Sequence, residues 1–151
     1  MINSCKTKFK HFENLHKIVC KRRVKDKIYT GVATCHPEDY DFESNLVGEH
    51  YAYVRSLIDE MCHDRDEYLA QLKILRHIYD IYEQNPSISY DSHECYILRR
   101  QIRILEEDIA EIRILIKETK ANLRNLISEK DKMYNKMRNL REKQKVLDAV
   151  E

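Results

Sequence analysis

Residues 92–149 limit the fold of this chain more than any other stretch, because they contain no glycine or proline and repeat apolar residues at spacings of four and three. This pattern predicts one long amphipathic helix with a coiled-coil seam, on the order of 80 Å in length at 1.5 Å per residue. Only Thr119, Lys130 and Gln144 interrupt the seam. Its two series of positions are Ile102, Ile109, Ile116, Leu123, Lys130, Met137 and Gln144, and Leu98, Leu105, Ile112, Thr119, Leu126, Met133, Leu140 and Leu147.

The two halves of this helix differ in apolar width. Beside the seam, the first half carries the additional apolar residues Ile97, Ile104, Ile114 and Leu115. We therefore expect both another helix and the strands to bury the first half. The second half has a narrow stripe that we expect to lack a partner in its own chain, so the sequence predicts a homo-oligomer held through the C-terminal helix.

The rest of the chain supplies one more helix and a small sheet. A 4-3 apolar spacing from Val54 to Tyr82 predicts a first helix over about 44–83, which Pro86 ends. Apolar runs over 16–22 and 27–35, separated by charged residues, predict a pair of strands; a further strand over 6–12 is left open.

The predicted fold class is therefore α+β, with a small N-terminal antiparallel sheet packed on a long antiparallel helical hairpin of coiled-coil character. The sheet region is expected over 1–43 and the hairpin over 44–151, with its second helix at about 92–149. We expect the two regions to form one continuous domain.

Charge is distributed in blocks along the chain. Residues 1–35 hold nine lysines and arginines against two acidic residues, 36–95 hold four against fourteen, and 96–151 hold fourteen against ten. Intramolecular neutralisation is the simplest interpretation, and nucleic acid is a partner that remains open without being favoured. With no apolar run of the roughly 20 residues that a membrane span needs, and five widely spaced cysteines, we expect a cytoplasmic protein with reduced thiols and no membrane partner.

Little in the sequence indicates catalysis. Two glycines cannot form a phosphate-binding loop, and Cys35-His36 is a weak candidate for a dyad because catalytic partners usually come from different parts of a fold. Cys62-His63 and the pair His93 and Cys95 lack the spacing of a zinc site. We therefore expect a protein that is not an enzyme, with no catalytic residue, metal or cofactor.

Arginines and aromatic residues form the best candidate for a binding site. Three arginines fall in the first turns of the second helix, where backbone amides favour anions, and nearby tyrosines could stack on a base. Aromatic residues of the loop around Pro37 are similar candidates. The candidate ligand-binding residues are Arg99, Arg103, Arg100, Tyr90, Tyr96, His36, Tyr40 and Phe42. The alternative is a solvated basic face with tyrosines packed at its edge.

The stretch from Gly31 to Glu43, GVATCHPEDYDFE, followed by Gly48, Ala52 and Arg55, resembles a motif of small proteins of bacterial phages and mobile elements. It is also similar to a double-stranded-RNA-binding-like fold, in which a small sheet packs on a helix. Within this group the chain resembles the anti-Thoeris sponge proteins. That resemblance implies a homo-oligomer, in the cytoplasm of a bacterial host, that sequesters a cyclic ADP-ribose variant. The chain departs from the motif at Tyr40 and Ser56.

Three functions are consistent with these features, and we rank a sponge for a nucleotide-derived signal first. Second is a protein-binding inhibitor of a bacterial defence nuclease, of the anti-CRISPR type, whose acidic block from Glu38 to Glu67 imitates a nucleic-acid backbone. Third is a coiled-coil adaptor or double-stranded-RNA binder that uses the basic segment Lys21-Arg22-Arg23-Lys25 on phosphates.

Overall fold

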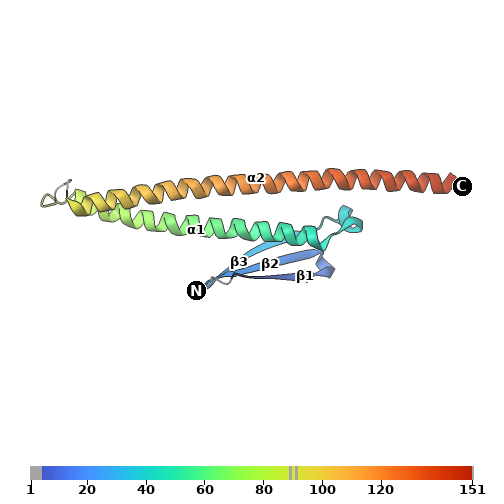
Figure 1. Ribbon diagram of the computed structural model, residues 1–151, viewed down its shortest axis with the longest axis horizontal. Coiled ribbons are helices and arrows are strands. Elements are labelled where there is room, and N and C mark those ends of the chain that lie inside the picture. The colour runs from blue at the N-terminus through green and yellow to red at the C-terminus, as the bar shows by residue number, and fades with distance from the viewer. Residues whose placement is uncertain (1–4, 89, 91, 151) are drawn as a thin grey trace. The chain divides into compact units, whose positions relative to one another are not determined.

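The computed structural model describes residues 5–88, 90 and 92–150. It has an α+β fold, as predicted, in which a three-stranded antiparallel sheet packs against two long helices. The strands lie in the order β1-β2-β3 (Figure 1), so the strand that the sequence left open does form. Their bounds are Lys6–Phe12 for β1, Lys17–Val24 for β2 and Lys27–Thr34 for β3.

Two long helices follow the sheet, and both start at serine caps. Helix α1 spans Asn45–Glu83 and α2 spans His93–Val150, which confirms the predicted bounds to within one residue. The hydroxyl of Ser44 accepts from the backbone N–H of Val47, and that of Ser92 accepts from Cys95, each at 3.3 Å. These bonds satisfy N–H groups that a helix start leaves without a partner. Short 3₁₀ helices, η1 (Glu13–Leu15) and η2 (Pro37–Phe42), complete the chain.

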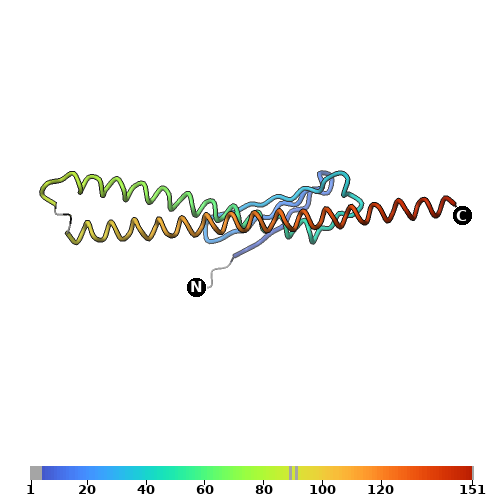
Figure 2. The backbone as a smooth tube through the Cα atoms, turned by 90° about the horizontal axis from the view of Figure 1, so that it is seen from above, coloured from blue at the N-terminus to red at the C-terminus, as the bar shows by residue number. Residues whose placement is uncertain are grey.

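Contacts divide the chain into two units, and the boundary cuts both long helices. The sheet unit comprises Met1–Asp59 and Thr119–Glu151, and the hairpin unit comprises Glu60–Glu118. In the hairpin unit α1 and α2 run side by side in opposite directions (Figure 2).

This division corrects our expectation of which half of α2 the strands cover. The sheet packs on the second half of α2, where Leu123 and Ile127 join the core, while Ile104 and Ile114 of the first half are 44% and 56% exposed. The reason is that the helices run antiparallel, so the start of α1 lies beside the second half of α2. The hydroxyl of Tyr51, near the start of α1, accordingly donates to the carbonyl oxygen of Leu126. The start of α1, to which the sheet is attached, therefore lies against part of the second half of α2, which has a partner there in its own chain, while residues 142–150 are all exposed.

The core of the sheet unit depends on close approach between β3 and α1. A Cβ atom on Gly31 would lie 1.9 Å from the carbonyl oxygen of Ala52 and 2.4 Å from the backbone nitrogen of Ser56, so only glycine fits. The small residues Ala52 and Ser56 are fully buried at this contact. The buried core residues around it are Ile18, Cys20, Ala33, Tyr51, Ala52 and Leu123.

Side chains of α1 also satisfy the outer edge of β3. The backbone N–H of Thr30 donates to Asp59 Oδ2 at 2.9 Å, and Arg55 Nη1 donates to the carbonyl oxygen of Val32 at 2.7 Å. Alternate residues of an edge strand expose unpaired backbone groups that can recruit another strand. Because α1 covers this edge, β1 remains the open edge of the sheet.

Candidate functional site

The sheet has a basic face, directed away from α1. Paired residues of neighbouring strands share a face, so the pairing of Cys20 with Gly31 places that pair inward and the adjacent positions outward. The outward face has no acidic residue, and six of its positions are lysine or arginine. This basic face consists of Lys6, Lys8, Lys10, Lys17, Lys21 and Arg23.

The arrangement of these charges is costly for the sheet itself. Lys6 lies opposite Arg23, and Lys8 opposite Lys21, so like charges face each other twice. Each such pair costs up to about 1 kcal/mol. Among the described residues none of the six makes an ion pair. Lysines protect an edge strand such as β1 from aggregation, but that need does not explain Lys21 and Arg23 on the central strand.

Strand alternation divides the strand residues of the basic segment Lys21-Arg22-Arg23-Lys25, which the sequence predicted to contact phosphates, between the two faces of the sheet. Arg22 points inward and is 3% exposed, whereas Lys21 and Arg23 point outward. The guanidinium of Arg22 donates to Ser56 Oγ at 2.8 Å and to the Ser56 carbonyl oxygen at 3.2 Å, and it lies over the rings of Tyr29 and Tyr53. Arg22 therefore joins the sheet to α1 and is not available to a ligand.

An open hollow adjoins the basic face at the β1–β2 turn. It has a volume of about 430 Å³, and two outward residues, Phe12 and Lys17, form part of its wall. The other lining side chains include His16 and Tyr40, whose rings stack with centroids 3.5 Å apart and planes 12° apart. Tyr40, which the sequence predicted as a ligand-binding residue, is 40% exposed here.

His16 is held in a conformation that non-glycine residues seldom adopt, with φ at 49°. Left-handed backbone of this kind costs of order 1 kcal/mol and often marks a functional position. Its carbonyl oxygen accepts from Cys35 N–H at 2.9 Å, and its Nδ1 lies 2.7 Å from Glu43 Oε2. Sequence analysis missed His16, because no residue pattern reports a positive φ at a histidine.

A smaller, partly open cavity of about 40 Å³ also lies in the sheet unit. The ammonium of Lys130 enters its wall, 5.5 Å from the ring of Tyr51 and 5.3 Å from that of Tyr134. Burial raises the pKa of both phenols. Burial also raises the pKa of the Cys35 thiol, with Glu43 and Asp39 adding to the effect, so this cysteine is a poor nucleophile. The cavity holds about three water molecules and no nucleotide.

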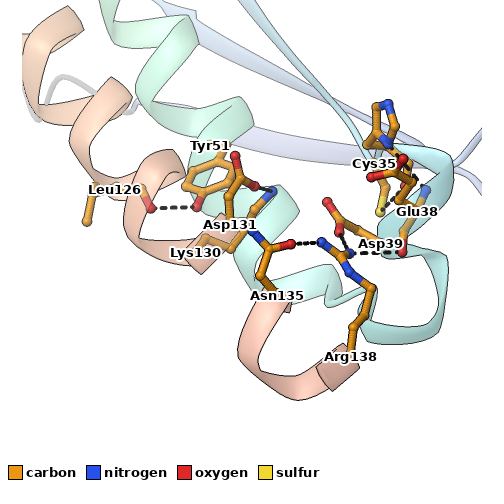
Figure 3. A network of polar contacts seen from close by, with 10 residues as sticks. Cys35, Glu38, Asp39, Tyr51, Leu126, Lys130, Asp131, Asn135 and Arg138 are labelled. Atoms are coloured by element: carbon orange, nitrogen blue, oxygen red, sulfur yellow. Dashed lines mark hydrogen bonds and ion pairs between the residues drawn. The ribbon is translucent and has the colours of Figure 1, made fainter. Parts of the chain in front are cut away.

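The loop around Pro37 is anchored to α2. Arg138 donates to the carboxylate of Asp39, which is 6% exposed, and to the carbonyl oxygen of Glu38 at 3.1 Å. Figure 3 shows Arg138 reaching from α2 toward this loop, with Asn135 beside it. A buried carboxylate needs such a partner.

Two predicted site residues of this loop therefore have structural roles. Nδ1 of His36 accepts from the N–H of Glu38 at 3.2 Å and caps η2. The ring of Phe42 packs on Tyr134 and under Arg141, whose guanidinium carbon lies 4.5 Å from the ring centroid. Of the three predicted loop residues, only Tyr40 lines the hollow.

The other five predicted site residues belong to the hairpin unit. Arg99 donates to the carbonyl oxygen of Tyr90 at 2.8 Å and lies 4.0 Å from the centroid of that ring. A side-chain hydrogen bond with Tyr79 raises the pKa of Arg99. Arg99 is thus already engaged within the chain. Three further predicted residues are exposed: Tyr96, Arg100 and Arg103, of which the last lies 3.8 Å from Glu107.

Several carboxylates of the acidic block from Glu38 to Glu67 also have partners within the chain. Glu49 Oε1 lies 2.7 Å from His11 Nε2, and Glu43, Asp39 and Asp59 have the partners described above. These contacts leave fewer free carboxylates for imitating a nucleic-acid backbone.

Among residues 5–88, 90 and 92–150, no cluster of three or more histidine, cysteine or acidic side chains could hold a metal ion. Within the same residues, no helix has the length and apolarity to span a membrane.

Searches of protein families, of curated proteins and of solved structures find no match to this chain. The resemblance to anti-Thoeris sponges therefore stays a prediction.

Proposed function

We propose that this protein is a non-catalytic binding protein whose basic face contacts the phosphate backbone of a nucleic acid. The supporting observation is the concentration of six lysines and arginines, with no acidic residue, on the outward side of the sheet. Two of these charges occupy the central strand opposite like charges, an arrangement that lowers stability unless an anion covers it.

Salt dependence of binding tests this proposal directly. If all six groups contact phosphates, the slope of log K against log salt is about −5 for a duplex and about −4 for a single strand. Fluorescence anisotropy with labelled DNA and RNA of each kind would measure it. We expect the double variant K8E/K21E to reduce the slope by about two and to weaken binding at least tenfold.

The control variant is K73E/K117E, which makes the same charge change at two exposed positions of the hairpin unit. It should bind like the unmodified protein. Absence of binding to any nucleic acid, or equal losses in the two variants, would reject the basic face as the interface.

A nucleotide-signal sponge is the second candidate, and the open hollow favours it. Its volume of about 430 Å³ lies within the roughly 300–1,000 Å³ of small-molecule sites, and Tyr40 and His16 offer stacked aromatic rings. This role, in the cytoplasm of a bacterial host, is what the anti-Thoeris resemblance implies. A thermal-shift screen with cyclic nucleotides and cyclic ADP-ribose isomers tests it, because a ligand of the folded state raises the melting temperature.

Self-association through α2 also stays a prediction. Apolar residues of its last part remain accessible, with Met133 at 51%, Leu140 at 64% and Leu147 at 62% exposed. Light scattering would decide the matter, and a strict monomer would contradict it.

A further inference from the structure

The hollow beside the basic face suggests which form of nucleic acid is bound. We infer that the protein binds single-stranded nucleic acid and stacks an unpaired base in the hollow, between the aromatic rings of Phe12 and Tyr40. This inference rests on the proposed function, since the basic face has to hold the backbone that delivers the base.

Continuity between the two features is the first argument. Phe12 and Lys17 are paired neighbours on β1 and β2, and both belong to the outward face and to the wall of the hollow. The lysines on β1 lead toward this pair, so a chain of phosphates that follows them arrives at the hollow. From Lys6 to Phe12 the strand extends about 20 Å, so its lysines can contact several successive phosphates of one strand.

The aromatic groups are the second argument. Phe12 is the sole aromatic residue on the outward side of the three strands, and it lies at the hollow. Nζ of Lys10 lies over one face of the Phe12 ring, 5.0 Å from its centroid, so a base has to stack on the other face, with this cation close enough for an adjoining phosphate. Tyr40 of η2 also lines the hollow, and its ring is held by the stack on His16.

Base geometry favours a single strand over a duplex. Aromatic side chains stack on bases that are unpaired and splayed out, whereas the bases of a duplex are stacked inside it.

The strained backbone of His16 gives the third argument, because it is held by Glu43, Cys35 and Tyr40 and fixes one wall of the hollow. Such fixed strain favours a preformed site.

The experiment compares labelled single strands of about ten nucleotides with the corresponding duplex, for the unmodified chain and for F12A and Y40A. We expect each variant to weaken single-strand binding about tenfold and duplex binding less than about twofold. The salt slope should not change, because no phosphate contact is lost. A 2-aminopurine base in the strand should lose fluorescence on binding to the unmodified protein and recover it with F12A.

Phe9→Ala is the matched control, since Phe9 is an inward aromatic residue of the same strand, 37% exposed, and does not line the hollow. Circular dichroism melts of all three variants would identify any that fails to fold. Equal weakening of single strand and duplex by F12A and Y40A, or no weakening by either, would overturn the stacking inference while K8E/K21E still tests the basic face.

A free mononucleotide forms the last arm of the experiment, because the aromatic rings that line the hollow suit a base from either source. We expect it to compete only at concentrations far above those of the oligonucleotide, since it lacks the phosphates that follow β1. Binding of the mononucleotide as tight as that of the strand would overturn the inference in favour of the sponge.

Discussion

The sheet unit and the hairpin unit are built in contrasting ways. The sheet unit carries nineteen lysines and arginines against thirteen acidic residues, and the hairpin unit carries eight against thirteen. The sheet unit has a closely packed interface of backbone, small residues and buried polar groups. The hairpin unit has one narrow seam, whose buried apolar residues are Leu72, Cys95, Leu98, Ile109 and Ile116.

This difference shows which unit can carry a preformed site. Side chains that bind a ligand need supports that do not move, and rigid elements with buried polar contacts provide them. Arg22, Ser56 and Asp39 are buried polar residues of the sheet unit, each with a defined partner. Among the described residues of the hairpin unit no polar side chain is buried, so we expect this unit to act as a spacer or an association surface.

The largest effect should come from Gly31→Ala. The added methyl group meets backbone atoms of α1, which cannot turn aside, so β3 and the helix must separate. We expect a loss of at least about 3 kcal/mol in the free energy of unfolding. Urea unfolding would measure it, and hydrogen exchange should show lost protection in the sheet unit and little change in the hairpin unit.

Gly48→Ala is the control for this change. Its Cβ would meet only the side chain of Ile18, whose terminal Cδ1 would lie at 2.5 Å and Cγ1 at 3.6 Å. Alanine also favours a helix over glycine by about 1 kcal/mol, which offsets the crowding. Similar losses for the two variants would mean that the close approach at Gly31 is not what holds the sheet unit together.

Arg22→Ala should have the second largest effect, and Arg23→Ala the contrasting one. Removing the buried guanidinium leaves Ser56 Oγ with only the weak thiol donor of Cys20 and opens space between two tyrosine rings, at a cost of about 2–3 kcal/mol. Removing exposed Arg23 relieves its repulsion with Lys6 and should change stability by less than about 0.5 kcal/mol. Thermal melts of both variants would compare them, and a costly Arg23→Ala would show that the strand register is different.

The sequence predicted the elements better than their packing. The heptad pattern and the break at Pro86 gave α1 and α2 almost to the residue, because these signals are local. The position of the sheet on α2 followed from the hairpin geometry, and counting back from the turn near Pro86 would have placed Tyr51 close to Leu126. The width of the apolar stripe on α2 did not predict which half the sheet covers, because stripe width shows how much surface a helix can bury and not which neighbour buries it.

The candidate site could be predicted only in part. Basic residues near β2 were visible, but the alternation that buries Arg22 and exposes Lys21 and Arg23 required a strand register. Tyr40, which lines the hollow, was predicted as a site residue because it is an aromatic residue in a polar loop. His16 gave no signal, since its role depends on a positive φ and on partners distant in sequence. The lysine in the apolar seam, Lys130, was the one visible sign of the smaller cavity.

Alkaline pH should weaken the sheet unit through its buried tyrosines. Burial raises the pKa of Tyr51 and Tyr134, so the unfolded chain ionises first as the pH rises above about 10. The folded state then binds more protons than the unfolded state, and the free energy of unfolding falls with pH. Urea midpoints between about pH 8 and 11 should fall less in Y51F/Y134F than in the unmodified chain.

Tyr90→Phe controls for this titration, because Tyr90 is 63% exposed. Its urea midpoints should follow those of the unmodified chain. An identical alkaline decline in Y51F/Y134F would assign the pH dependence to other groups, such as the buried thiol of Cys20, whose pKa burial also raises.

The smallest effect should come from the ion pair between Arg76 and Glu106 in the hairpin unit. Their charged atoms are 2.7 Å apart, but the side chains are 56% and 47% exposed, so water and salt screen the attraction. We expect Arg76→Ala to lower the free energy of unfolding by no more than about 0.5 kcal/mol, and the difference to vanish at about 1 M salt. Thermal melts at low and high salt would measure it. A loss above about 1 kcal/mol that persists in salt would mean that polar contacts hold the hairpin unit as they hold the sheet unit, and the contrast between the units would fail.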